Sequence, residues 1–145
     1  MSDDARAVEN LIYTYAERID AGDLAGIGEL FRHGRLQAAP GMVLIGADEV
    51  RALYERTTRL HDNGTPRTHH VTTNVAVELG DPTGTATARS YFTVFQQTEE
   101  LALQPIIAGR YHDTFHRVEG VWCFESREMF VDLTGDLSHH LRFEL

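Results

Sequence analysis

The separation of two hydrophobic periodicities along the chain is the strongest constraint on its fold. Through the first sixty residues, apolar side chains recur three and four positions apart, which is the spacing of amphipathic helices. From about residue 68 they alternate at every second position, which is the spacing of strands. Helices and strands that occupy different parts of a chain favour an α+β domain, with helices packed on one side of an antiparallel sheet.

The boundaries of the expected elements follow from turn residues and from the two periodicities. We expect helices at about 3–20, 23–31 and 47–61, and a short extended pair at 35–39 and 42–45 around Pro40 and Gly41. Four long strands follow at about 68–79, 85–98, 104–118 and 121–133, with turns at 80–84 and 119–120. The tail would add one helical turn capped by Asp136. The length of 145 residues predicts a single domain over residues 1–145.

Composition excludes several classes of function. A formal net charge of −9 argues against nucleic-acid and anionic membrane partners, because such a surface repels phosphate groups. No run of residues approaches the roughly 18 apolar positions that a membrane span needs. The acidic start of the chain lacks the apolar core of a signal peptide, so we expect a cytoplasmic protein. Eight histidines and the lone Cys123 show no metal-ligand spacing, and we expect neither a metal nor another cofactor.

Several motifs resemble the SnoaL-like branch of the nuclear transport factor two-like superfamily. They are the run from Tyr15 to Leu24, the run Gly109 to Phe115, then Gly120-Val121-Trp122 with Arg127, and the closing run 132–138. The resemblance covers nearly the whole chain. It implies a cone-shaped, cystatin-like fold, in which a curved mixed or antiparallel sheet packs against three N-terminal helices. This fold hosts dehydratases, isomerases, cyclases and non-catalytic subunits, so it specifies the reaction only weakly.

Within the superfamily, two positions resemble an Asp–His dyad. Scytalone dehydratase and hexachlorocyclohexane dehydrochlorinase place the Asp at the end of the first helix and the His in a His-x-x-x-Asn segment of the first long strand. Here Asp20 and His70 occupy those positions, with Asn74 following. The neighbouring His69 faces the other way on a strand, and the sequence leaves open which of the two faces the pocket.

Two departures from relatives narrow the chemistry. Ketosteroid isomerase resembles this chain at Tyr15 and at residues 21–24, but its catalytic carboxylate lies in the first hairpin, and residues 35–40 contain none. Scytalone dehydratase has a second histidine on the next strand, where residues 90–92 are Ser, Tyr and Phe. The first departure argues against isomerase chemistry of that kind. The second weakens scytalone-type dehydration more than base catalysis in general.

The residues themselves support the same reading, with plain structural alternatives. An imidazole held by a carboxylate is a competent general base near neutral pH, although Asp20 also suits a helix end. Tyr15, Tyr54 and Tyr111 are candidates for substrate binding, and each would equally suit core packing. Arg127 lies among apolar residues, so it either binds an anionic or carbonyl group of the substrate or pairs with a buried carboxylate.

Two functions remain open. The first is a lyase or isomerase that uses the Asp20–His70 base on a small hydrophobic substrate, aromatic or polycyclic in character, with dehydration or another elimination favoured. The second is a non-catalytic binding or assembly module, like the small subunits of ring-hydroxylating dioxygenases. In either case the open face of the sheet predicts a homo-oligomer, a dimer or a trimer.

Overall fold

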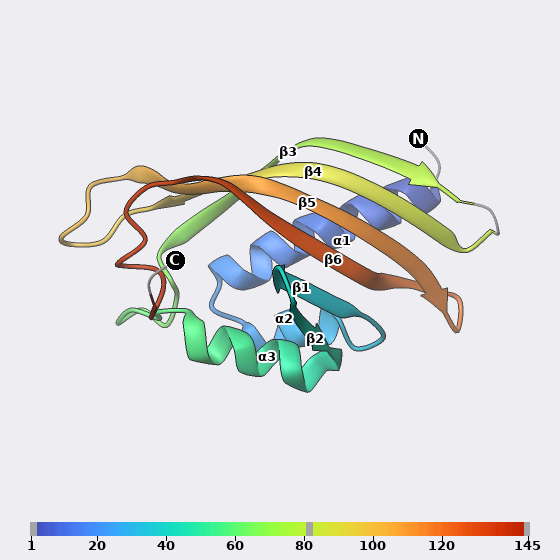
Figure 1. Cartoon of the computed structure of the whole chain (residues 1–145), viewed down its shortest axis with the longest axis horizontal. Helices are drawn as coiled ribbons and strands as arrows, with labels where there is room; N and C mark the ends of the chain where they lie inside the picture. Colours follow the sequence, from blue (N-terminus) through green and yellow to red (C-terminus); the bar gives the residue numbers. More distant parts are fainter. Residues whose placement is uncertain (1–2, 81–82, 144–145) are drawn as a thin grey trace.

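In the part of the chain that the structure describes, helices come first and long strands follow, as the periodicities predict (Figure 1). The computed structural model describes residues 3–80 and 83–143, so part of the predicted 80–84 turn lies outside it. The helices are α1 (Asp3–Asp20), α2 (Leu24–Leu30) and α3 (Gly46–Thr57). The strands are β1 (Arg35–Ala39), β2 (Met42–Ile45), β3 (Thr68–Leu79), β4 (Thr85–Gln96), β5 (Gln104–Val118) and β6 (Val121–Thr134). None of these helices is both long and apolar enough to cross a membrane.

All six strands form one curved, open sheet in the order β2-β1-β6-β5-β4-β3. Neighbouring strands are antiparallel except β1 and β6, which are parallel, so the sheet is mixed. The helices lie together on the concave side of the sheet, and the C-terminal segment returns from β6 toward the end of α3 (Figure 1). The predicted α+β class, with a curved mixed sheet against three N-terminal helices, is confirmed.

A bulge in β6 changes which side chains face inward. Glu125 is the extra residue, opposite the junction of Thr114 and Phe115 on β5. Phe124 and Arg127 are therefore both buried, although strict alternation places them on opposite faces of the strand. The bulge thus sends a charged side chain into the core.

The core is solid at one end and hollow at the other. At the solid end, the ring of Phe124 stacks on Phe31 with centroids 4.9 Å apart and packs on Phe115 at 4.8 Å. Val8 and Ile12 from the first half of α1 are fully buried in the same cluster. The second half of α1 instead borders a cavity, which is where the functional candidates gather.

The end of α3 differs from the prediction, whereas the C-terminal tail follows it. Helix α3 ends at Thr57 rather than near residue 61, because Thr58 turns extended and pairs with Leu141 in an antiparallel bridge. The predicted helical turn after Asp136 is present: the backbone N–H groups of His140 and Leu141 donate to the Leu137 carbonyl at 3.0 and 2.9 Å. The Asp136 carboxylate caps the turn, since it accepts hydrogen bonds from the backbone and hydroxyl of Ser138. The tail is therefore a single turn fixed against the end of α3.

Candidate active site

The chain brings Asp20 and the start of β3 together through a tight contact beside the end of α1. Gly22 ends the helix with φ +75°, and a Cβ atom there would lie 2.2 Å from the Gly64 carbonyl oxygen. Only glycine allows this approach, which holds the loop before β3 against the helix end. Arg67, the residue before β3, also takes a positive φ of 56°. The backbone then enters β3 directly beside the Asp20 carboxylate.

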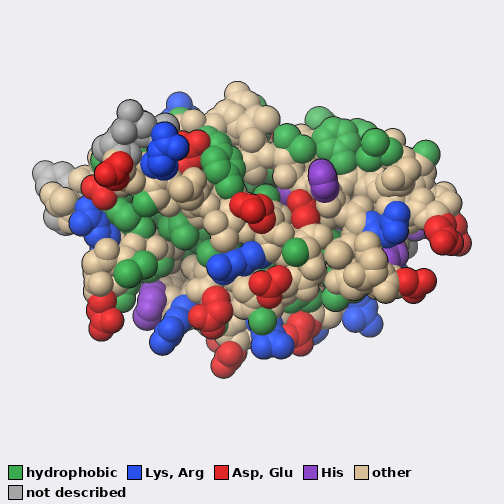
Figure 2. Space-filling model, turned by 180° about the vertical axis from the view of Figure 1, so that it is seen from behind, with side chains coloured by type: hydrophobic (Ala, Val, Ile, Leu, Met, Phe, Trp, Pro, Cys, Tyr) green, Lys and Arg blue, Asp and Glu red, His purple; other side chains and the backbone are tan. Residues whose placement is uncertain are grey.

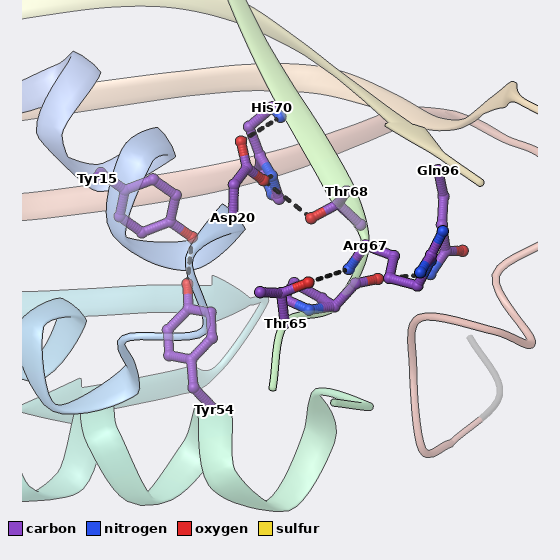
Figure 3. Close-up of polar contacts among 9 residues, drawn as sticks. Tyr15, Asp20, Tyr54, Thr65, Arg67, Thr68, His70 and Gln96 are labelled. Carbon is purple, nitrogen blue, oxygen red and sulfur yellow. Dashed lines mark hydrogen bonds and ion pairs between the residues drawn. The ribbon is translucent and has the colours of Figure 1, made fainter. Parts of the chain in front are cut away.

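Asp20 accepts three hydrogen bonds from β3 (Figure 3). The Thr68 hydroxyl donates to Oδ1 at 2.8 Å, and the His70 backbone N–H donates to Oδ2 at 2.8 Å. The His70 ring contacts Oδ1 through Nδ1 at 2.7 Å. Both oxygens of the carboxylate are thus committed to one strand, which fixes the ring orientation.

These hydrogen bonds determine the charge and the tautomer of the pair. Burial alone would raise the pKa of Asp20, but the bonds from His70 and Thr68 outweigh it and hold that pKa below its ordinary value. The ionised carboxylate requires a proton on Nδ1 of His70. Nε2 of His70 therefore carries the lone pair, which is the arrangement a general base needs.

The structure also resolves the choice between the adjacent histidines. His69 is exposed on the outer face of the sheet. The His70 side chain is 8% exposed, pairs with Asp20 and lines the cavity. Sequence alternation alone predicts that the two rings point apart, and the contact with Asp20 identifies the inward one.

A cavity of about 480 Å³ lies beside His70. Its walls are mainly apolar and include Ile19, Leu53, Phe92, Val94, Ile107 and Met129, which come from helices and strands far apart in the chain. Such a volume and lining suit a small hydrophobic molecule held by a few polar groups.

Tyr15 and Tyr54 place a pair of hydroxyl groups at this cavity. Their hydroxyls are hydrogen-bonded to each other across α1 and α3 (Figure 3). Burial raises the pKa of both groups, so both stay neutral. Since one hydroxyl donates to the other, the second keeps a proton for another acceptor. The Tyr15 ring lies 6.4 Å from the His70 ring, centroid to centroid.

Tyr111 and Arg127 both pack against the ring of Tyr15. Tyr111 lines the cavity and stacks on Phe92 at 4.4 Å. The Arg127 guanidinium lies 3.6 Å from the Tyr111 ring centroid and 4.4 Å from that of Tyr15. It is fully buried, forms two hydrogen bonds to Asp113 at 2.8 and 3.0 Å, and does not line the cavity. The suggested substrate contact for Arg127 therefore gives way to the alternative, a structural pair that supports two tyrosine rings.

His140 is a candidate that the sequence did not single out. It comes from the C-terminal tail, is 8% exposed and lines the cavity with its ring centroid 6.2 Å from that of His70. Burial, followed by the proximity of the His70 ring, lowers the pKa of His140 to about 4, so the His140 ring is neutral near pH 7. The available signal was only the pair His139-His140, and no periodicity connects that pair to residue 70.

Among residues 3–80 and 83–143, no group of three or more His, Cys, Asp or Glu side chains is placed to hold a metal ion. The described polar groups of the cavity are instead suited to proton transfer and hydrogen bonding. The Asp20–His70 pair offers a proton acceptor, while the tyrosine pair and His140 offer neutral polar groups.

The fold and the sequence together define the class of protein. Residues 1–128 match the description of the SnoaL-like domain. The chain belongs to this family, as the motifs around Asp20, Gly109 and Trp122 predicted. No curated protein matches the chain by sequence.

Solved structures show the same fold at low sequence identity. One is named "Putative Scytalone Dehydratase" from Novosphingobium aromaticivorans, at 24% identity and TM-score 0.73, covering 92% of this chain and 87% of that one. An NTF2-like protein with a cystatin-like fold from the same organism has 21% identity and TM-score 0.73, covering 94% and 86%. ActVI-ORFA from Streptomyces coelicolor has 18% identity and TM-score 0.73, covering 90% and 98%. The chain therefore has an NTF2-like, cystatin-like fold.

Proposed function

We propose that this chain is a cofactor-independent lyase of the SnoaL-like family that removes a carbon-bound proton from a small hydrophobic substrate. The observation that carries the proposal is the Asp20–His70 pair, whose free ring nitrogen belongs to a residue lining an apolar cavity. The name of one structural neighbour, a dehydratase, agrees with elimination as the reaction.

The chemistry starts with proton abstraction beside a carbonyl group. Nε2 of His70 takes the proton, and Asp20 stabilises the imidazolium that forms. The electron pair of the broken C–H bond forms a C=C bond as the neighbouring C–O bond breaks. The leaving hydroxyl takes the proton from His70, so that water departs and the base is regenerated. The spare proton of the Tyr15–Tyr54 pair stabilises the carbonyl oxygen while negative charge builds on it.

The apolar walls set the expected substrate class. A cyclic or bicyclic β-hydroxy ketone offers the hydrophobic surface and the two oxygen functions that this reaction needs. We therefore choose 3-hydroxy-1-tetralone as a probe, because loss of water converts it to 1-naphthol, which is followed by fluorescence.

The test compares two adjacent histidines. His70→Gln removes the base, and we expect the rate of naphthol formation to fall by about 10²–10⁴-fold. His69→Gln is the matched control, since His69 is exposed on the opposite face and its loss leaves the rate unchanged. Deuterium exchange next to the carbonyl of 2-tetralone reports proton abstraction without a leaving group.

The outcomes separate the alternatives. Exchange without elimination would indicate an isomerase or cyclase that uses the same base. If wild type and His70→Gln show equal rates of both naphthol formation and deuterium exchange, the proposal is wrong and a non-catalytic binding module is favoured.

A further inference from the structure

His140 has an arrangement that core packing does not explain. Its Nδ1 atom is sealed from solvent and has no hydrogen-bond partner among the described residues. A buried polar atom without a partner lowers stability, because it loses its hydrogen bonds to water and gains none in the protein. An apolar ring of similar size would avoid this cost at a position that is already buried.

The tail that carries His140 is nevertheless held firmly in place. The His140 carbonyl accepts a hydrogen bond from the Arg59 backbone at 2.8 Å, and the Arg142 backbone donates to the Thr57 carbonyl at 2.8 Å. The Gln96 side chain, which is buried, donates to the neighbouring His139 carbonyl at 3.0 Å. The backbone that carries the imidazole is thus held by three hydrogen bonds, two to the segment at the end of α3 and one to β4.

The sealed nitrogen indicates which tautomer the ring adopts. Buried N–H groups without a partner are rarer than buried acceptors without one. We therefore place the lone pair on Nδ1 and the proton on Nε2, the ring nitrogen left to face the cavity. The neutral ring then offers a hydrogen-bond donor where His70 offers an acceptor.

The spacing of the two rings fits one oxygen atom. Their centroids lie 6.2 Å apart and their planes are inclined by 67°. Each ring nitrogen extends about 1 Å from its centroid, so an oxygen between the rings can lie within hydrogen-bond reach of both. The hydroxyl groups of Tyr15 and Tyr54 offer a second place for an oxygen atom, because Tyr15 on α1 also lies beside the His70 ring.

We propose that His140 is a substrate-binding residue whose Nε2–H holds the leaving hydroxyl oxygen next to His70. The cavity then selects substrates that carry two oxygen functions, a carbonyl bound by the tyrosine pair and a β-hydroxyl bound between the two imidazoles. This proposal rests on the lyase function proposed above, and it assigns a substrate class to the same site.

The experiment measures binding, so that it does not depend on turnover. In the His70→Gln background, which prevents reaction, dissociation constants are measured by calorimetry for 3-hydroxy-1-tetralone and for 1-tetralone, which lacks the hydroxyl. With His140 present we expect the hydroxyl to tighten binding about tenfold, the value of one hydrogen bond. His140→Phe abolishes that preference and leaves the affinity for 1-tetralone unchanged. His140→Gln, which keeps an N–H donor near Nε2, restores it.

Stability gives a second readout that a merely structural role would not produce. Since His140→Phe removes a buried atom without a partner, we expect its free energy of unfolding in urea to be equal to or above that of the parent. A variant that binds the hydroxyl less well while being at least as stable supports a substrate contact.

Failure of this proposal is distinguishable from failure of the lyase function. If the hydroxyl preference survives in His140→Phe, or if 1-tetralone affinity falls instead, the hydroxyl contact is overturned even where wild type forms naphthol. If wild type forms no naphthol but the preference depends on His140, the contact stands and the lyase function fails.

Discussion

At the scale of single residues, the Arg127–Asp113 pair shows how a charge is kept inside this fold. Both side chains are fully buried, and two hydrogen bonds join them. The guanidinium also contacts the faces of the Tyr15 and Tyr111 rings. The pair therefore links the inner surface of the sheet to the hydroxyl donors of the cavity.

We predict that Asp113→Asn lowers the free energy of unfolding by about 3 kcal/mol, because it leaves Arg127 buried without its counter-charge. The chain offers a matched control on the same two strands. Arg110 and Asp132 form a two-bond pair of the same kind at 2.9 and 3.0 Å, but it is exposed. Asp132→Asn should lower the free energy of unfolding far less, because solvent screens the exposed pair. Urea denaturation of both variants checks this, and equal losses would contradict it.

At the scale of elements, the C-terminal tail is the least regular part of the cavity wall. Its described residues form one turn and no longer helix or strand, and they depend on bonds to residues 57–59 and on the Gln96 side chain. Gln96 donates to the carbonyls of both Pro66 and His139, so it joins the start of β3 to the tail. The loop that precedes His70 and the tail that carries His140 are thus both hydrogen-bonded to the Gln96 side chain.

We predict that Gln96→Leu loosens this junction. Hydrogen exchange at the amides of Arg59 and Arg142 should become about tenfold faster, since local opening loses the bonds of Gln96. Gln97→Leu is the control, because the Gln97 side chain is exposed at the next position. Amides in the β4–β5 ladder should exchange at unchanged rates in both variants. Exchange at Arg59 and Arg142 that matches wild type in Gln96→Leu would rule out this role.

At the scale of the whole molecule, the helices cover one face of the sheet and leave the other open. Tyr91, Arg110 and Phe130 form a row across β4, β5 and β6 on this outer face, where Tyr91 is 51% exposed. Seen from behind, hydrophobic side chains gather along part of the upper edge among mixed charges (Figure 2). A surface that carries both exposed apolar side chains and scattered charges suits contact with a second copy of this chain.

The homo-oligomer expected from the sequence stays a prediction. Light scattering at micromolar concentration should give at least twice the chain mass of 16.3 kDa. Tyr91→Glu would weaken association by placing a charge in the contact. Val121→Glu, at an exposed position next to the β5–β6 turn, would leave it unchanged. A wild-type mass of one chain would contradict the prediction.

The parts of the site that the sequence predicts are those set by local structure. Asp20 ends a helix, His70 lies near the start of a strand, and a family motif marks both positions. The six strand positions and the first two helices follow from periodicity and turn residues to within a few positions. Such features depend on neighbours in the chain, which a sequence records directly.

The remaining features depend on contacts between distant segments. The partner of Arg127 could not be assigned, because the bulge at Glu125 shifts the faces of β6. The early end of α3 and the place of His140 both result from the pairing of Thr58 with Leu141. No local pattern marks that bridge, and so the second imidazole was missed.

The cavity is lined partly by the sheet and partly by an irregular tail, and this division has a consequence for the evolution of such a protein. His70 is part of β3, whereas His140 and Leu137 belong to a segment outside the sheet. We expect mutations in the tail to alter which molecules enter the cavity without disturbing strand pairing. The binding preference of the cavity and the fold could then evolve separately, and libraries for directed evolution are best confined to residues 137–142.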